Sequence, residues 1–310
     1  MKPLTTEQIR AVIARGKLRD NLFKGLGVFC LALALIVIVA LIADMVIKGA
    51  DRFTLDFFIN FASRRATQAG ILSAWVGSLL VMLVTALAAV PLGVAAGLYL
   101  EEYAKRNWVT NVIEINITNL AAVPSIVYGL LALGIFVYQF GFGQSILSAG
   151  LTLALLILPI IIVSTREAIR AIPAMIREGS MAVGATRWQT CRYHIVPYAM
   201  PGILTGVIIG LARAIGETAP IITIGALTFI AFLPPAPYSA LGDGTTAGLF
   251  DWVMAPFTVM PIQIFNWTSR PDPAFEVNAA AAGFVLMAMV LSMNAVAIYL
   301  RYKMRKNIKW

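Results

Sequence analysis

The sequence contains few charged residues, one histidine and two cysteines. Charged residues make up 13% of its 310 positions, whereas a soluble domain carries about 25%. So little charge cannot cover an ordinary water-facing surface, and a mean hydropathy of +0.84 agrees with this. The composition therefore excludes a soluble globular domain. The single His194 and the scattered Cys30 and Cys191 predict neither a metal site nor a disulfide framework.

Motifs for nucleotide and acid–base chemistry are also missing. No glycine-rich loop is followed by Lys and Ser or Thr, so we expect the chain to bind no nucleotide or other cofactor itself. His194 lies in a polar, basic segment, away from the other candidate polar groups. No nucleophile, base and orienting group converge in the sequence, so no catalytic residue is predicted and a membrane enzyme is disfavoured.

Long apolar runs dominate what is present. A helix needs ~20 mainly apolar residues to cross a membrane. Six runs qualify: between Lys24 and Asp44, Trp75 and Leu100, Val112 and Phe140, Ile146 and Val163, from near Ala199 onward, and between Glu276 and Arg301. Backbone polar groups in lipid need internal partners, which predicts an all-α membrane protein with six transmembrane helices. The first run exceeds the ~7–15 apolar residues of a secretory signal, so we interpret it as an uncleaved anchor.

The basic residues are distributed unequally between the connections. Alternate connections carry 18 Lys and Arg against 5 on the other side. This bias predicts that both termini and residues 101–111 and 165–198 lie in the cytoplasm. The basic residues behind the net charge of +9 are then explained by the orientation of the chain in a membrane, and no nucleic-acid partner is expected. Residues 232–274, rich in Pro and Gly, are predicted to form an outer loop or a re-entrant segment.

Two charged residues fall inside an apolar run. Arg213 and Glu217 are four residues apart, which places them on one face of a predicted fifth helix. Counted from Ala199, Arg213 lies ~21 Å along that helix, deep in the hydrocarbon. Pro220 is expected to kink the helix just beyond the pair. The pair is either a structural ion pair between helices or part of an anion path, in which the arginine fork suits oxyanions.

Two further segments allow alternative interpretations. In the third run, Pro124, Ser125 and Gly129 predict a loosened helix that either lines a pore or simply kinks. Residues 165–198 are amphipathic and basic, and we expect short helices with a turn at Gly184. Their apolar face either fills a groove on a partner protein or lies on anionic lipid headgroups.

Several motifs together resemble those of one transporter family. Residues 178–184 read Glu-Gly-Ser-x-x-x-Gly, and His194-x-Val-Pro197 follows after nine residues. This spacing is similar to the EAA loop of ABC-importer permeases, although Gly179 and Ser180 replace two alanines. Further motifs resemble those of the PstA-type permeases of phosphate-specific (Pst) transporters. They are Pro91-Leu-Gly-x-x-x-Gly-x-Tyr-Leu-x-Glu102-Tyr, Val123-Pro-Ser-Ile-Val-Tyr-Gly129, Ala212-Arg-x-x-Gly-Glu-Thr-Ala-Pro220 and Pro261-Ile-x-Ile-Phe265, and the likeness runs from about residue 70 to the C-terminus.

The resemblance implies a type I ABC importer permease fold and a division of the chain at residue 70. Residues 1–70 would hold the N-terminus, the first transmembrane helix and an outer connection, and residues 71–310 the permease domain. The implied partners are a PstC-like permease, two PstB-like ATPase subunits that bind ATP, a periplasmic PstS-like phosphate-binding protein and the lipid of a bacterial inner membrane.

The resemblance also assigns roles to residues. Arg213, Glu217, Thr218 and Ser125 are expected in the substrate path, where Arg213 meets phosphate and Glu217 balances it. The expected contacts of the coupling loop with the ATPase are Glu178, Gly179, Ser180, Ala182, Gly184 and Pro197. The sequence thus predicts a phosphate importer permease. A permease for molybdate, sulfate or phosphonate, or an anion channel, remains the alternative.

Overall fold

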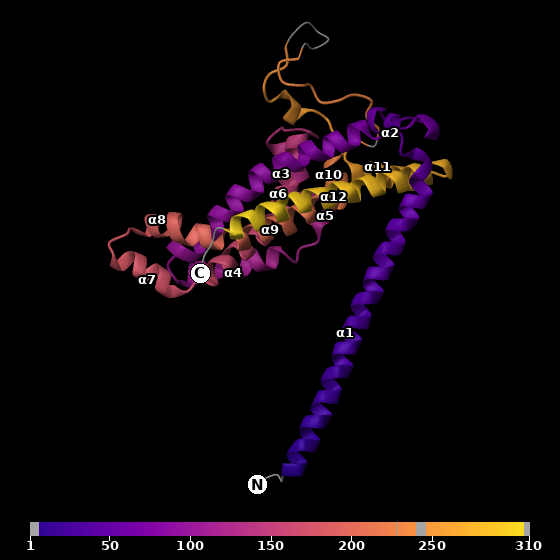
Figure 1. Ribbon diagram of the computed structural model, residues 1–310. Helices are drawn as coiled ribbons and strands as arrows, with labels where there is room; N and C mark the ends of the chain where they lie inside the picture. The colour runs from indigo at the N-terminus through magenta and orange to yellow at the C-terminus, as the bar shows by residue number, and fades with distance from the viewer. Residues whose placement is uncertain (1–5, 228, 240–245, 307–310) are drawn as a thin grey trace.

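The computed structural model describes residues 6–227, 229–239 and 246–306, and their regular structure is helical. The longer helices pack into one bundle, from which α1 extends (Figure 1). The elements are α1 (Thr6–Gly49), η1 (Ala50–Arg52), α2 (Leu55–Ile59), η2 (Ala66–Gln68), α3 (Leu72–Leu98), η3 (Tyr99–Tyr103), α4 (Trp108–Leu120), α5 (Ser125–Ala132), η4 (Leu133–Gln139), α6 (Ile146–Arg170), α7 (Ala174–Ala182), α8 (Arg187–Thr190), η5 (Cys191–Ile195), α9 (Val196–Gly216), α10 (Ala219–Ile224), η6 (Asp251–Met254), α11 (Met260–Thr268) and α12 (Ala274–Lys306).

Helix α6 lies at the centre of the bundle, between α3 and α9. Gly93 and Gly97, one turn apart on α3, let the backbones approach closely. A Cβ added at Gly93 would lie 2.7 Å from Ile161, and one added at Gly97 would lie 2.7 Å from Thr165. Small residues at this spacing are a common way to pack helices in membranes, where lipid supplies no hydrophobic drive for helix association.

Five helical segments are long and apolar enough to cross a membrane, among the described residues, and a bent pair of helices makes a sixth candidate. The predicted second, fourth and sixth runs correspond to α3, α6 and α12. Helix α1 extends well beyond the predicted first run on both sides. The chain is therefore a multi-pass membrane protein.

The predicted third span is not a straight helix. The chain bends by 106° between Trp108–Leu120 and Ser125–Gln139. Pro124 precedes α5, and a proline disfavours helical backbone in the residue before it, here Val123. The expected loosening near Ser125 is therefore a complete break, and α4 is a separate helix that packs on α6.

The fifth span begins and ends at different residues from those predicted. Its helix begins at Arg187 and continues through η5 into α9, so it starts before the predicted Ala199. Helix α9 ends at Gly216, where Glu217 adopts extended backbone at φ −76° and ψ 126°. The expected kink just beyond the charged pair thus lies at Glu217 itself. Pro220 occupies the first turn of the following α10, where its missing amide hydrogen breaks no helical bond.

The segment predicted as an outer loop contains a partly buried helix. Helix α11 packs against α12 and α3, and Trp267 is fully buried there. The predicted segment is therefore not a loop throughout, because residues 260–268 form a packed helix. Residue 228 and residues 240–245, the latter within the predicted loop, lie outside the described residues.

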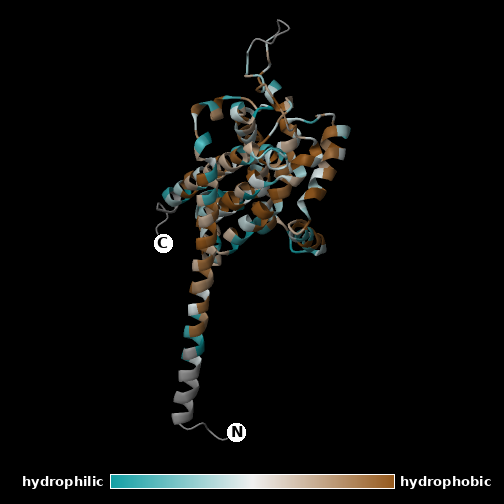
Figure 2. Cartoon of the chain, turned by 90° about the vertical axis from the view of Figure 1, so that its right-hand side faces the viewer, coloured by the Kyte–Doolittle hydropathy of each residue, from teal (hydrophilic) through white to brown (hydrophobic). Residues whose placement is uncertain are grey.

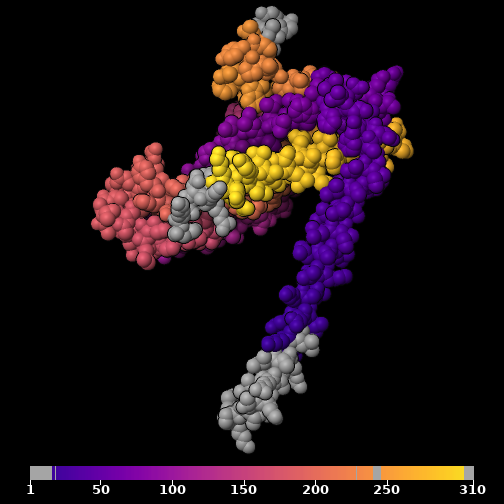
Figure 3. Space-filling view, viewed as in Figure 1, coloured from indigo at the N-terminus to yellow at the C-terminus, as the bar shows by residue number. Residues whose placement is uncertain are grey.

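Helix α1 leaves the bundle and extends away from it (Figures 1 and 3). Its last turns pack on α12, where Gly49 faces Ala281. The apolar window of α1 has no buried residue within the chain, and most of the part of α1 that Figure 2 colours is hydrophobic. Such a helix requires lipid or another protein around it.

The two ends of the bundle carry different elements. Helices α4, α7 and α8 lie at the end where α12 finishes, whereas α2 and α11 lie at the opposite end (Figure 1). The structure thus groups the basic segment 165–198 with residues 101–111, as the charge bias predicts. Which end faces the cytoplasm stays a prediction.

Candidate functional site

The predicted charged pair is in contact. Arg213, on the last turn of α9, donates from Nε to Oε1 of Glu217 at 3.2 Å. The two side chains differ in exposure, with 37% of Arg213 accessible but only 18% of Glu217. The pair thus joins the two sides of a helix break, and the arginine is the partner that a ligand can reach.

Glu217 lines a small internal cavity. Its other lining residues include Ser78 and Met82 of α3, Leu153 of α6 and Pro261 of α11. The cavity holds only about 10 Å³, which is room for about one water molecule. A tetrahedral oxyanion does not fit there. In this conformation an anion could meet the pair only from the exposed side of Arg213.

Thr218 and Ser125 lie at the starts of two short helices. Thr218 precedes α10 and lines a wider hollow between α10, α11 and α12. Ser125 is the first residue of α5 and is half-buried. Among the described residues, no hydrogen bond or ion pair joins Ser125 to Arg213 or Glu217. The structure therefore places Thr218 next to the pair along the chain, but it does not bring Ser125 to it.

Helices α5 and α10 pack directly on each other. A Cβ added at Gly129 of α5 would lie 2.6 Å from Cα of Pro220, so only glycine allows this approach. Tyr128 donates from its hydroxyl to the carbonyl of Leu120 at 2.8 Å and so spans the break before α5. The break beside Ser125 and the break at Glu217 thus belong to neighbouring half-helices. Irregular backbone at membrane depth is typical of cavity linings and binding sites.

The segment 165–198 contains the predicted helices and turn. Helix α7 ends at Ala182, and Gly184 has φ +91°, a left-handed conformation that favours glycine. Thr186 and Gln189 then form a capping box at the start of α8. The predicted coupling residues Glu178, Gly179, Ala182, Gly184 and Pro197 are exposed, as are the apolar Met181 and Val183.

Ser180 differs from the other predicted coupling residues. It is half-buried, and its hydroxyl lies 3.0 Å from the hydroxyl of Thr190 on α8. This contact ties the two short helices together. Ser180 therefore shapes the segment from within, and the exposed residues around it remain available to a partner.

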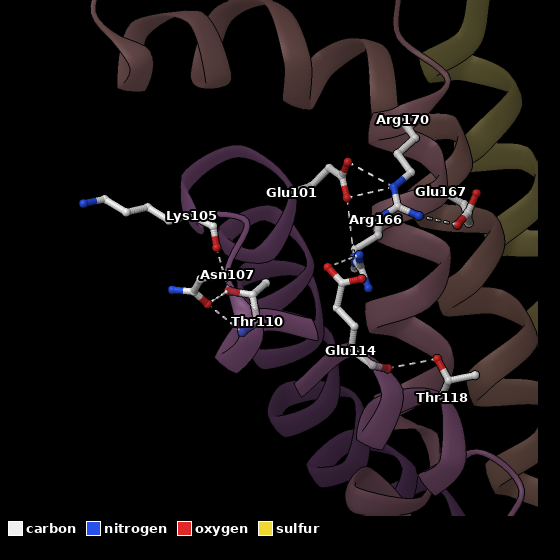
Figure 4. Close-up of polar contacts among 9 residues, drawn as sticks. All are labelled: Glu101, Lys105, Asn107, Thr110, Glu114, Thr118, Arg166, Glu167 and Arg170. Carbon is white, nitrogen blue, oxygen red and sulfur yellow. Dashed lines mark hydrogen bonds and ion pairs between the residues drawn. The ribbon is translucent and has the colours of Figure 1, made fainter. Parts of the chain in front are cut away.

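A cluster of charges near α7 was not predicted from the sequence. Arg166 of α6 is 7% exposed and lies 3.4 Å from Glu101 of η3 and 2.5 Å from Glu114 of α4 (Figure 4). Arg170 contacts the same Glu101 at 3.0 Å. These partners lie 52 to 69 positions apart in the sequence, so no local pattern reveals them. The polar character of Glu114 at the start of the third run was the one available signal.

The known proteins that this chain resembles are membrane components of transport systems. The family described as binding-protein-dependent transport system inner membrane component matches residues 89–309. The probable ABC transporter permease protein YqgI of Bacillus subtilis is 30% identical over 284 residues, covering 90% of this chain and 94% of the relative. The phosphate transport system permease protein PstA of Mycobacterium leprae is 29% identical over 305 residues, covering 97% and 94%.

A solved structure shares the fold. The bacterial alginate ABC transporter in complex with an alginate pentasaccharide-bound periplasmic protein contains a chain that superposes with a TM-score of 0.62 at 14% identity. The superposition covers 91% of this chain and 94% of that one. The arrangement of helices is therefore that of an ABC importer permease.

Proposed function

Because the chain belongs to the family of binding-protein-dependent transport system inner membrane components, we propose that it is the permease subunit of an importer for inorganic phosphate. It works in a bacterial inner membrane and is driven by a separate ATPase. Relatives named as phosphate permeases span nearly the whole chain, which supports phosphate as the substrate. The observation that carries the proposal is the Arg213–Glu217 contact at the break between α9 and α10.

Arg213 supplies the chemistry that an oxyanion requires. Its planar guanidinium carries a positive charge and offers several hydrogen-bond donors in a fixed fork, which matches the geometry of an oxyanion. Glu217 occupies the Nε donor in the present state, and a phosphate that arrives on the exposed side competes for the remaining donors. Release of the anion restores the contact with Glu217. Thr218 adds a hydroxyl beside this path, and Ser125 joins it when the half-helix α5 moves.

The proposed assembly contains three kinds of partner. A homologous PstC-like permease completes the path on the exposed side of Arg213. Two PstB-like ATPase subunits bind ATP and hold the coupling loop, with Glu178, Gly184 and their exposed neighbours at the contact. A periplasmic PstS-like protein delivers phosphate at the end of the bundle that carries α11. Both termini of the chain then lie in the cytoplasm.

Transport by the reconstituted complex tests the function. The chain is co-purified with an ATPase, a second permease and a binding protein of the Pst type from the same organism, and ATP-dependent uptake of labelled phosphate into proteoliposomes is measured. A complex with an inactive ATPase is the control. Unlabelled molybdate, sulfate and phosphonate are added as competitors. Uptake of one of these in place of phosphate would identify a permease for another oxyanion, and anion conductance without ATP would identify a channel.

A further inference from the structure

The turn that ends α3 carries two adjacent carboxylates with different partners. In η3, Glu101 contacts Arg166 and Arg170 of α6, whereas Glu102 contacts Arg177 of α7. Element η3 is a π-helix, a wider turn that is frequent at functional sites. Glu101 is therefore ion-paired with the transmembrane helix α6, and its neighbour Glu102 is ion-paired with the short helix α7.

Arg177 is the most extensively bonded residue at this junction. Its Nε donates to Oε1 of Glu102 at 2.9 Å, and its Nη2 lies 2.7 Å from the same carboxylate. The guanidinium also donates to the carbonyl of Ile169 in the last turn of α6 and to that of Ile172 just after the helix, each at 2.9 Å. Arg177 and Glu102 are only 22% and 11% exposed. The planar guanidinium, with five N–H donors in a fixed fork, holds these three acceptors at once.

Helix α7 depends on these polar bonds because it has little packing of its own. None of its residues is buried, and Ile176 alone packs in part against the core. Ser180 connects α7 to α8, but Arg177 is the link from α7 to the ends of both α3 and α6. Helix α6 in turn packs against α9, which carries Arg213.

We infer that Arg177 and Glu102 are positioning residues that transmit movement of α7 to the transmembrane helices. The inference rests on the proposed function, in which the ATPase holds α7. A displacement of α7 pulls on η3 and on the end of α6 together, and so reaches the helices around the charged pair. Neither residue needs to touch the substrate or the ATPase for this role.

The first test separates coupling from assembly in the purified complex. In Arg177→Gln and in Glu102→Gln, phosphate uptake per ATP hydrolysed should fall by about tenfold, as expected when a charge-assisted hydrogen bond is lost, while the ATPase still co-purifies. Arg192→Gln is the matched control, because Arg192 carries the same charge in the same segment and its guanidinium lies over the ring of the neighbouring Tyr193. Arg177→Lys, which keeps the charge and three donors but loses the planar fork, should retain part of the coupling.

Two results of this test would overturn the inference. One is native uptake per ATP in both Arg177→Gln and Glu102→Gln. The other is loss of the ATPase from the complex, which would mean that Arg177 only shapes the docking surface.

The second test needs no transport. Spin labels are attached at Met175→Cys on α7 and Tyr99→Cys on η3, both exposed positions, after Cys30→Ser has removed the exposed cysteine. In the complex, the distance between the labels should be narrowly distributed, and Arg177→Gln should broaden it. An unchanged distribution would contradict the inference. A broadened distribution in a complex that transports no phosphate would refute the proposed substrate and leave the inference standing.

Discussion

Arg213 and Glu217 meet across the end of a helix. Arg213 belongs to the last turn of α9, Glu217 has left the helix, and their charged atoms lie 3.2 Å apart. In a continuous helix the backbone would fix the separation of the two Cα atoms. Because the backbone between α9 and α10 is not helical, small changes at the break alter the distance between the two charges. The contact can therefore open without the loss of a complete helix.

Replacement of Arg213 should reduce transport without preventing assembly. A charge-assisted hydrogen bond contributes ~1.5–3 kcal/mol, so Arg213→Gln is expected to lower phosphate uptake by at least about tenfold. Arg213→Lys keeps the charge but loses the fork and should fall between Arg213→Gln and the native chain. Arg64→Gln, a charge change at an exposed position of the connection between α1 and α3, is the control. Native uptake by an assembled Arg213→Gln complex would remove this residue from the path.

The turn at Gly184 should tolerate few side chains. Its φ of +91° is unfavourable for a β-branched residue, so Gly184→Val must change the angle between α7 and α8. We expect weaker ATPase binding, or ATP hydrolysis without transport, in Gly184→Val. Gly184→Asn is the matched variant, because asparagine adopts left-handed backbone at lower cost. The measurements are co-purification of the ATPase and uptake per ATP. Equal behaviour of both variants and the native protein would exclude a structural requirement at this turn.

Close packing of α3 on α6 should make Gly97 sensitive to size. A Cβ at this position would lie 2.7 Å from the Thr165 side chain, so Gly97→Leu forces the helices apart. Overpacking costs about 1–3 kcal/mol, and we expect a lower unfolding temperature in detergent. Gly134→Leu is the control, since no atom lies within 4 Å of an added Cβ there. A similar temperature shift in both variants would show that the effect is not specific to this interface.

The buried Arg166 should be more costly to remove alone than with its partner. In Arg166→Met, Glu114 loses the cation that lies 2.5 Å away. Loss of one member of a fully buried pair costs about 3–5 kcal/mol, and the cost here is smaller because Glu114 is 32% exposed. Replacement of both members by apolar residues is often neutral. We therefore expect Arg166→Met to lower the unfolding temperature strongly and Arg166→Met with Glu114→Leu to recover much of the loss. Additive destabilisation would show that the two residues act independently.

Much of the fold follows from local sequence. Helices α3, α6 and α12 can be identified from the sequence alone, because a long apolar run without charge has no alternative to a helix in lipid. The turn at Gly184 is also local, since only the residue types in the turn matter. The break before Ser125 was expected only as a loosening, because Pro124 indicates where a helix is weak but not how far it bends.

The charged pair was identified because ionisable residues are rare in apolar runs. The exposure of the two side chains could not be predicted from the sequence, because the packing of α3, α6 and α11 buries Glu217 and leaves Arg213 accessible. The bonds of Arg166 and Arg177 to Glu101, Glu114 and Glu102 were likewise beyond local patterns. Hydropathy and charge bias establish a multi-pass membrane protein and its helical runs, since lipid acts on each segment separately. The folded bundle decides which charges meet, because these contacts join residues from distant parts of the chain.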